Sequence, residues 1–148
     1  MIIKKIWFST LFSTLFLSAA NTLPMKSLEG SWLLQTLDGH QVYKARSILD
    51  FHAKYKKIDG FDGCNRIAGK LDLHPNDLYS SKLHKQPYEC RTSLHAYVSK
   101  HLDQTIAEGF TIQKATMKGE KGILLKSTHH TLFFKKLGGD SLFDTILK

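Results

Sequence analysis

The sequence predicts a mainly β (α+β) fold, in which a strongly curved antiparallel sheet is interrupted by one amphipathic helix. Two observations carry this prediction. Most apolar residues alternate with polar ones, which is typical of strands with one buried and one solvated face. One stretch, residues 93–108, instead repeats its apolar residues every three or four positions, as a helix does. No internal repeat or Pro-rich linker divides the chain, so we expect one domain.

The first half of the chain contains four alternating runs. The run 30–37 places Trp32 and Leu34 on one face and ends at Asp38-Gly39, a dipeptide typical of hairpin turns. Three further strands are expected after it. Their buried faces are formed by Leu49, Phe51 and Ala53, then by Tyr55 and Ile58, and then by Ile67, Gly69, Leu71 and Leu73.

The predicted helix separates these strands from three more. Ser93 or Thr92 is a suitable N-cap, and Gly109 a suitable C-terminal stop. The apolar face of the helix contains Leu94, Tyr97, Val98, Leu102, Thr105 and Ile106. The closing strands bury Phe110 and Ile112, Ile123 and Leu125, and Leu132 and Phe134. Residues 138–148 form a tail for which both a strand and a short helix remain open.

Residues 1–20 have the pattern of a signal peptide. Lys4 and Lys5 precede an apolar run from Ile6 to Leu17, which is too short to span a bilayer comfortably. The small residues 18–20 then predict cleavage before Asn21. The alternative is a buried N-terminal helix. A lipid anchor is not expected, because a lipobox would need a cysteine at position 20. We expect a protein that is released to the periplasm or secreted.

The mature chain is small and basic. Cleavage leaves 128 residues, with 19 basic and 13 acidic side chains and a formal net charge of +6. Such a charge attracts nucleic acid, anionic lipid surfaces or acidic glycans. The lysines are scattered, however, and their densest group, residues 54–57, contains one aromatic residue. This arrangement does not predict a nucleic-acid groove. We expect a monomer with a short lead at 21–27 and no transmembrane span.

The segment GFDGCNRIAG, residues 60–69, is the most distinctive in the chain. Gly60 and Gly63 each follow an aspartate, so both are expected in turns that need a positive φ. The Asn65 side chain is expected to hydrogen-bond to nearby backbone. Gly69 lies in a strand pattern, where a glycine indicates a bulge or the close approach of another backbone. The segment therefore predicts a rigid corner around Cys64.

The two cysteines, Cys64 and Cys90, are expected to form a disulfide. They are 26 residues apart, and two cysteines in one small exported domain usually pair. The alternative is a Cys–His hydrolase with Cys64 as a free thiolate, which an oxidising compartment disfavours. A thiol oxidoreductase is not indicated, because no C-x-x-C motif occurs.

The histidines do not predict a metal centre. His95 and His101 are six residues apart and fall on different faces of the predicted helix. The adjacent His129 and His130 point to opposite sides if they lie on a strand. We therefore expect solvated histidines, with no metal, no cofactor and no catalytic residue.

The same residues carry a family resemblance. Residues 60–69 resemble the glycine–cysteine–asparagine signature of META domains, the HslJ-like family of small exported bacterial proteins. The signature positions are Gly60, Gly63, Cys64, Asn65 and Gly69. The run 31–39 is similar to the opening Trp strand of the family, and the resemblance extends over residues 28–137. It implies an incomplete antiparallel β-barrel interrupted by one helix.

Two departures from the family pattern matter. Members usually carry Thr-x-Met-x-Cys before the helix, whereas residues 86–90 read QPYEC, so only Cys90 is retained. An aromatic residue is common where this chain has Ile67.

The family is associated with envelope stress rather than with a reaction. The resemblance therefore implies a non-enzymatic, stress-related interaction module whose partner is an envelope protein, a lipid or an anionic surface. The alternative is a carrier that holds a small apolar ligand or lipid inside the barrel.

Overall fold

The structure, a computed structural model, describes residues 23–138. The expected signal peptide at 1–20 lies outside the described residues, as does the tail beyond Gly138. Four short 3₁₀ helices occur, at Met25–Leu28, Tyr43–Ala45, Ala53–Tyr55 and Pro75–Asp77. The remaining elements are β1 (Gly30–Leu37), β2 (His40–Gln41), β3 (Ile48–His52), β4 (Lys57–Phe61), β5 (Arg66–Lys70), β6 (Asp72–His74), β7 (Leu78–Ser80), β8 (His84–Gln86), α1 (Ser93–Glu108), β9 (Thr111–Met117), β10 (Glu120–Lys126) and β11 (Thr131–Leu137).

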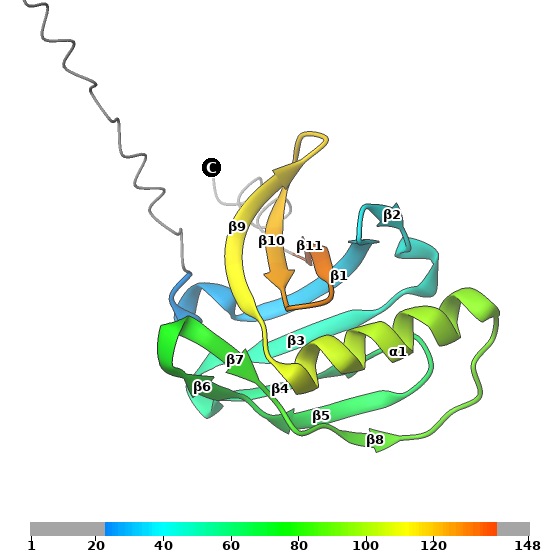
Figure 1. The fold of residues 1–148 in the computed structure, drawn as a ribbon, viewed down its shortest axis with the longest axis horizontal. Helices are drawn as coiled ribbons and strands as arrows, with labels where there is room; N and C mark the ends of the chain where they lie inside the picture. Colours follow the sequence, from blue (N-terminus) through cyan, green and yellow to red (C-terminus); the bar gives the residue numbers. More distant parts are fainter. Residues whose placement is uncertain (1–22, 139–148) are drawn as a thin grey trace, which may run out of the picture.

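One antiparallel sheet forms most of the molecule. Its strands lie in the order β8-β5-β4-β3-β1-β11-β10-β9, and β2 pairs with the end of β1 (Figure 1). The pairing of β1 with β11 joins the two halves of the chain on either side of α1. The register of this pair shifts between Leu34 and Thr36, where β1 contains an irregularity. The prediction of a mainly β fold interrupted by one helix is confirmed.

The sheet curves into an incomplete barrel. Within residues 23–138 its first and last strands, β8 and β9, do not pair with each other. The β6–β7 hairpin forms a separate two-stranded sheet. Tyr79 of β7 and Phe110 exchange two backbone hydrogen bonds of 2.8 Å, which connect this hairpin to the start of β9. The barrel is thus bridged on this side by one residue pair rather than by a full strand pair.

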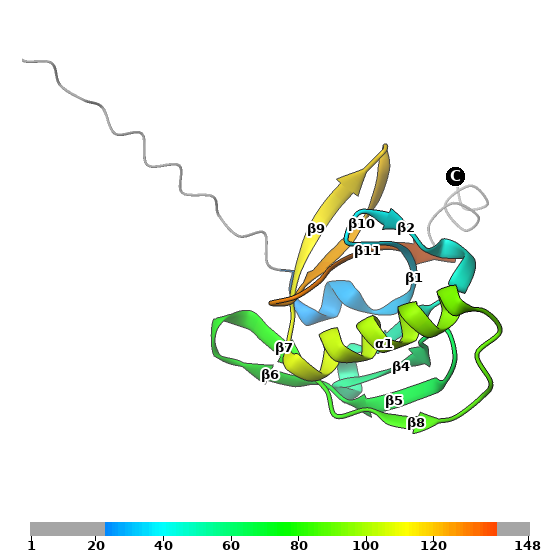
Figure 2. The ribbon, with the colours of Figure 1, turned by 45° about the vertical axis from the view of Figure 1, so that its right-hand side comes forward.

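Helix α1 lies between β9–β11 on one side and β4, β5 and β8 on the other (Figure 2). Its bounds agree with the prediction, Thr92 accepts a hydrogen bond from the His95 amide as the N-cap, and Gly109 follows its last turn. The core contains Val98, Leu102 and Ile106 from this helix together with the buried strand residues Trp32, Leu34, Leu49, Phe51, Ile58, Ile67, Phe110, Ile112, Ile123, Leu125, Leu132 and Phe134. No helix in the described part of the chain is long and apolar enough to cross a membrane.

Three residues expected on buried strand faces lie elsewhere. Leu73 is 61% exposed, because the strand is interrupted at Leu71 and β6 then pairs only with β7, outside the barrel wall. Tyr55 is 66% exposed, and Ala53 begins a 3₁₀ helix instead of ending β3. Before β1, Leu23 is buried in the core and Met25 packs against it, although both fall in the expected lead at 21–27.

Two glycines allow backbone segments to pack closely. Gly60 lies within β4 rather than in a turn, and its φ of +146° is one that side chains rarely adopt. It pairs with both Leu49 and Ile67. Gly69 pairs with Ile58 without a bulge. A Cβ at Gly69 would lie 2.9 Å from the Lys82 carbonyl oxygen, so the alternative of a close backbone approach is the correct one.

Replacing Gly60 should therefore destabilise the barrel strongly. A Cβ at this position would overlap the carbonyl oxygen of Ile48 on the neighbouring strand. We expect Gly60→Ala to lower the free energy of unfolding by roughly 3 kcal/mol, since strain and overpacking combine. Gly39→Ala is the matched control, because Gly39 also has a positive φ but has no atom within 4 Å of an added Cβ. The control should lose only about 1 kcal/mol. Equal losses in urea denaturation would contradict the packing argument.

Candidate functional site

The corner between β4 and β5 is organised by the Asp62 carboxylate. Asp62 is fully buried, and its Oδ1 accepts hydrogen bonds from the amides of Cys64 at 2.8 Å and Asn65 at 2.6 Å. The Asn65 Nδ2 donates to Asp62 Oδ2 at 3.1 Å, and the Asp62 amide donates to the Asn65 carbonyl at 3.0 Å. Burial by itself would raise the pKa of Asp62, but the hydrogen bonds donated to its carboxylate lower this pKa overall. The carboxylate, rather than the predicted Asn65 side chain, is what bonds to the backbone here.

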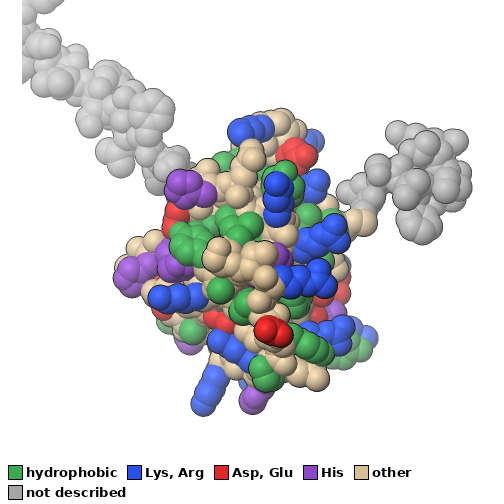
Figure 3. All heavy atoms as spheres, turned by 90° about the vertical axis from the view of Figure 1, so that its right-hand side faces the viewer, with side chains coloured by type: hydrophobic (Ala, Val, Ile, Leu, Met, Phe, Trp, Pro, Cys, Tyr) green, Lys and Arg blue, Asp and Glu red, His purple; other side chains and the backbone are tan. Residues whose placement is uncertain are grey.

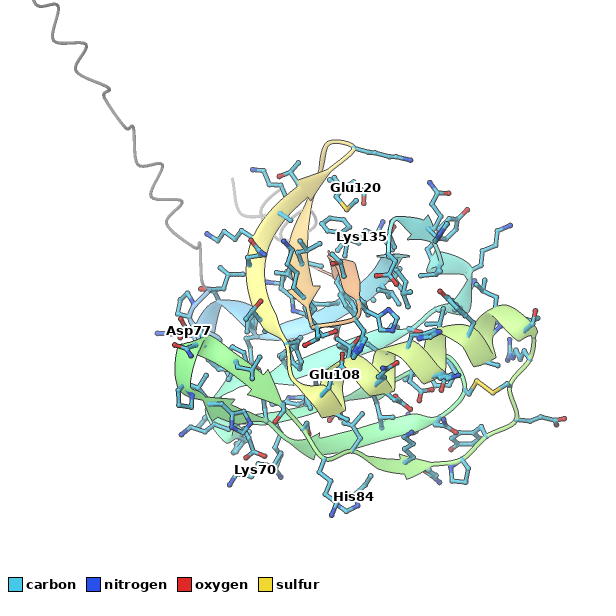
Figure 4. The ribbon with its side chains drawn as sticks, viewed as in Figure 1. Lys70, Asp77, His84, Glu108, Glu120 and Lys135 are labelled. Atoms are coloured by element: carbon cyan, nitrogen blue, oxygen red, sulfur yellow. A yellow bond between two sulfur atoms is a disulfide. The ribbon has the colours of Figure 1, made fainter. Side chains whose placement is uncertain are left out.

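The same corner holds α1. Asn65 Nδ2 also donates to the Ser99 hydroxyl of the helix at 3.3 Å. At Gly63 the backbone lies so close to α1 that a Cβ would be 3.0 Å from the His95 carbonyl oxygen. Cys64 and Cys90 lie at disulfide distance, with their Cα atoms 4.6 Å apart. The sulfur–sulfur link is drawn near the N-terminal end of α1 (Figure 4). The signature residues therefore attach the helix to the sheet.

A second carboxyl group, Asp103 of α1, is buried beside Asp62. Burial and the nearby Asp62 carboxylate raise the pKa of Asp103 to about 7, although Lys85 Nζ of β8 lies 2.6 Å from its Oδ2. Its other oxygen, Oδ1, is buried and accepts no hydrogen bond. A proton on Asp103 removes one of two neighbouring negative charges, and so lowers the cost of burying two carboxyl groups together.

Sequence reasoning missed four members of this cluster, namely Asp62, Lys85, Ser99 and Asp103. One indication was available. Ser99 and Asp103 each follow a residue of the apolar face of the predicted helix and are four positions apart, so they lie at the edge of that face. Polar side chains at such positions are buried when the helix packs deeply, and here both are buried. Lys85 carried no such indication, since its role depends on which element packs against β8.

The expectation of solvated histidines is wrong at the C-terminal half of α1. His101 Nδ1 lies 3.0 Å from His130 Nε2, and His130 Nδ1 lies 2.7 Å from Asp38 Oδ2. The His130 side chain is only 11% exposed. Burial, together with the neighbouring His130, lowers the pKa of His101. His129 turns away to Glu108, at 2.9 Å. Among residues 23–138, no group of three or more His, Cys, Asp or Glu side chains is arranged to hold a metal ion.

Two large hollows open on the surface formed by residues 23–138. One, of about 620 Å³, lies over β3, β4, β5 and β8 and has a lining of mixed charge that includes Asp50, Asp59, Arg66 and Lys85. The other, of about 740 Å³, is lined by β1, β9, β10 and β11 together with Leu23 and Ser27. Its charged lining residues are Lys114, Lys121 and Lys136, with no carboxylate. The two hollows therefore differ in charge, and only the second is purely basic.

Comparison with known proteins agrees with this architecture, that of a small incomplete barrel closed by one helix and a cysteine corner. The NMR structure of a protein from Burkholderia xenovorans aligns with a TM-score of 0.57 and 21% identity, over 78% of this chain and 87% of the other. A second NMR structure aligns with a TM-score of 0.60 and 19% identity, over 77% and 95% of the two chains. These similarities show the fold alone. No protein with a curated description matches the sequence.

The family is shown by a match to the META domain over residues 25–138. The chain therefore belongs to the META-domain family, as residues 60–69 suggested. The signature positions Gly63, Cys64 and Asn65 lie together at the corner, whereas Gly60 and Gly69 lie in the neighbouring strands.

The cysteine pair should contribute substantially to stability. We expect exported protein to show no titratable thiol before reduction. Closing a loop of 26 residues is worth about 3.5 kcal/mol in the chain-entropy description, so Cys64→Ser should lower the free energy of unfolding by roughly that amount. Reduced wild-type protein is the control and should unfold at the same temperature as the variant. Two reactive thiols in the native protein would contradict the pairing.

Asp103 should make stability fall as the pH rises. The pKa of Asp103 is about 7 in the folded chain, against 3.8 for an aspartate in an unfolded chain, so the unfolded chain loses this proton first. The contribution of this proton to the free energy of unfolding is therefore complete below pH 3.8 and is lost as the pH rises to about 7. We expect Asp103→Asn to gain stability relative to wild type between pH 4 and pH 8, measured by urea denaturation. The control Asp72→Asn, at an exposed position, should change in parallel with wild type. Parallel curves for all three proteins would exclude a proton on Asp103.

Proposed function

We propose that this META-domain protein is exported and acts as a non-enzymatic interaction module of the cell envelope, with a role in envelope stress. The proposed location is the periplasm or the extracellular medium, and the proposed state is a monomer. The basic, apolar and small-residue order of residues 1–20 supports export. The cysteine pair at disulfide distance fits an oxidising compartment.

A binding role is favoured by how the polar groups of the corner are used. Asp62 and Asn65 bond to each other and to the backbone, and Asn65 also bonds to Ser99. Cys64 is 1% exposed and paired with Cys90. A nucleophile or a general base must reach its substrate and change its bonding during the reaction. These side chains are instead occupied in attaching the helix to the sheet.

The basic hollow is the observation that carries the proposal. Lys114, Lys121 and Lys136 face one concavity whose lining contains no carboxylate. Lys and Arg side chains are also spread over the face shown in Figure 3. With a net charge of +6 after the expected cleavage, attraction speeds encounter with an anionic partner and weakens as salt is added. An anionic component of the envelope is therefore the proposed partner.

The carrier alternative needs room inside the barrel. The interior positions Trp32, Leu49, Phe51 and Phe134 are all buried, which matches the expectation of a filled interior. A ligand held among these residues would have to displace packed side chains, at a cost of a few kcal/mol. The module is for this reason the preferred proposal.

Gentle purification from the native envelope, followed by native mass spectrometry, tests the proposal. The mature chain should begin at Asn21, carry no covalent lipid and retain a stoichiometric anionic partner. Recovery of a chain that begins at Met1 would contradict export. A neutral lipid retained instead of an anionic partner would favour the carrier. Substrate turnover that stops in Cys64→Ser, in protein that still folds, would contradict both.

A further inference from the structure

The basic hollow is a consequence of strand alternation. On β1, β11, β10 and β9 the residues that face the barrel interior include Leu34, Phe134, Ile123 and Ile112, all buried. Two positions away on each strand, the same face carries Trp32, Lys136, Lys121 and Lys114. The register pairs Trp32 with Lys136 and Ile123 with Lys114. The inner face of the sheet thus changes from core to lysines at the mouth of the barrel.

The lysines of the hollow have no compensating charge. Within residues 23–138, neither Lys114, Lys121 nor Lys136 forms an ion pair. The nearest paired lysine in sequence, Lys135, lies on the outer face of β11 and contacts Glu120 at 3.9 Å, and both are labelled in Figure 4. Since Gly122 pairs with Lys135, the same register places Lys121 beside Lys136. Like charges on adjacent strands repel, and an anion between them would relieve that repulsion.

Apolar and hydroxyl groups complete the lining. Leu23, Trp32, Ala115 and Ile123 are the apolar residues of the lining, of which Trp32 is 6% and Ile123 1% exposed, and Ser27 and Thr116 supply hydroxyl groups. The Trp32 indole N–H already donates to the Leu28 carbonyl at 2.8 Å, so the ring is fixed and has no N–H left for a ligand. Lys136 Nζ lies 5.8 Å from the centre of this ring. A volume of about 740 Å³ is within the range of small-molecule sites.

We propose that this hollow binds an anionic amphiphile: a phosphate or carboxylate head between Lys114, Lys121 and Lys136, with an apolar chain over Trp32 and along the lysine stems. The inference rests on the proposed binding function and specifies the ligand class. Charge selects the head, because cations are repelled and a neutral head leaves the lysines unneutralised. The apolar lining selects the body, because packing the apolar chain over Trp32 and the lysine stems removes its apolar surface from water. A bare anion would contact the lysines but not the apolar part of the lining.

Dodecyl phosphate, kept below its micelle concentration, is a suitable probe. Trp7 lies in the expected signal peptide, so Trp32 is the sole tryptophan of the mature chain and its fluorescence reports on the hollow. We expect saturable binding that weakens with salt, with inorganic phosphate and dodecyltrimethylammonium binding at least about tenfold more weakly. The triple variant Lys114→Gln, Lys121→Gln, Lys136→Gln should raise the Kd for dodecyl phosphate about tenfold or more, since three attractions are lost.

The matched control removes the same charge elsewhere. Lys54, Lys70 and Lys100 are exposed and do not line the hollow, so their triple Gln variant should keep the Kd within about twofold of wild type, because distant exposed charges are screened. Equal losses in both variants, or no saturable binding by wild type, would overturn the proposal. Retention of a protein partner by native mass spectrometry in that case would leave the proposed module function intact.

A final measurement identifies the source of the amphiphile. Flotation with phosphatidylglycerol vesicles, compared with phosphatidylcholine vesicles, tests whether the head is read in a bilayer. Lysine-dependent flotation with the anionic vesicles supports a lipid ligand. Binding of monomeric dodecyl phosphate without flotation supports a soluble amphiphile. Flotation that is unchanged in the Lys114, Lys121 and Lys136 variant would show that another surface contacts the membrane and would overturn the assignment for lipids.

Discussion

The buried Asp62 carboxylate is the constraint on which the arrangement of this domain depends. A carboxylate without donors is expensive to bury, so this position is tenable only while the Cys64 amide, the Asn65 amide and the Asn65 side chain all point at it. That requirement fixes the backbone of residues 62–65. The fixed backbone then presents Gly63, Cys64 and Asn65 to α1 through a close approach, a cysteine pair and a hydrogen bond. The helix is held across the open barrel by these three contacts.

Helix α1 also carries two titratable groups that face the sheet, and burial shifts both toward their neutral forms. Asp103 has a raised pKa and His101 a lowered one, since desolvation penalises a charge of either sign. Each contacts a partner from another element, Asp103 an ammonium group on Lys85 of β8 and His101 the imidazole of His130 near β11. The helix is thus attached by polar contacts at both edges of its apolar face, and its stability responds to pH through both.

The corner and the basic hollow use their polar groups in opposite ways. The corner satisfies its polar groups internally and has little left to offer a ligand. The hollow is the reverse case, with Lys114, Lys121 and Lys136 uncompensated beside apolar surface. Net charge alone did not distinguish a scattered basic surface from a concentrated basic site. The curvature of the sheet makes the difference, because it turns the same face of four strands toward one concavity.

The sequence by itself determined the elements and their local geometry. Alternation and helical spacing are set by nearest neighbours along the chain, so α1 and the strands around Leu49, Ile123 and Phe134 were predicted correctly. Only the tertiary structure decided which elements meet. It turned Leu73 out of the core, buried Asp103 beside Asp62, and joined His101 to His130 across 29 positions. Contacts of that kind depend on how the sheet curves around the helix, a property of the whole chain that no local pattern encodes.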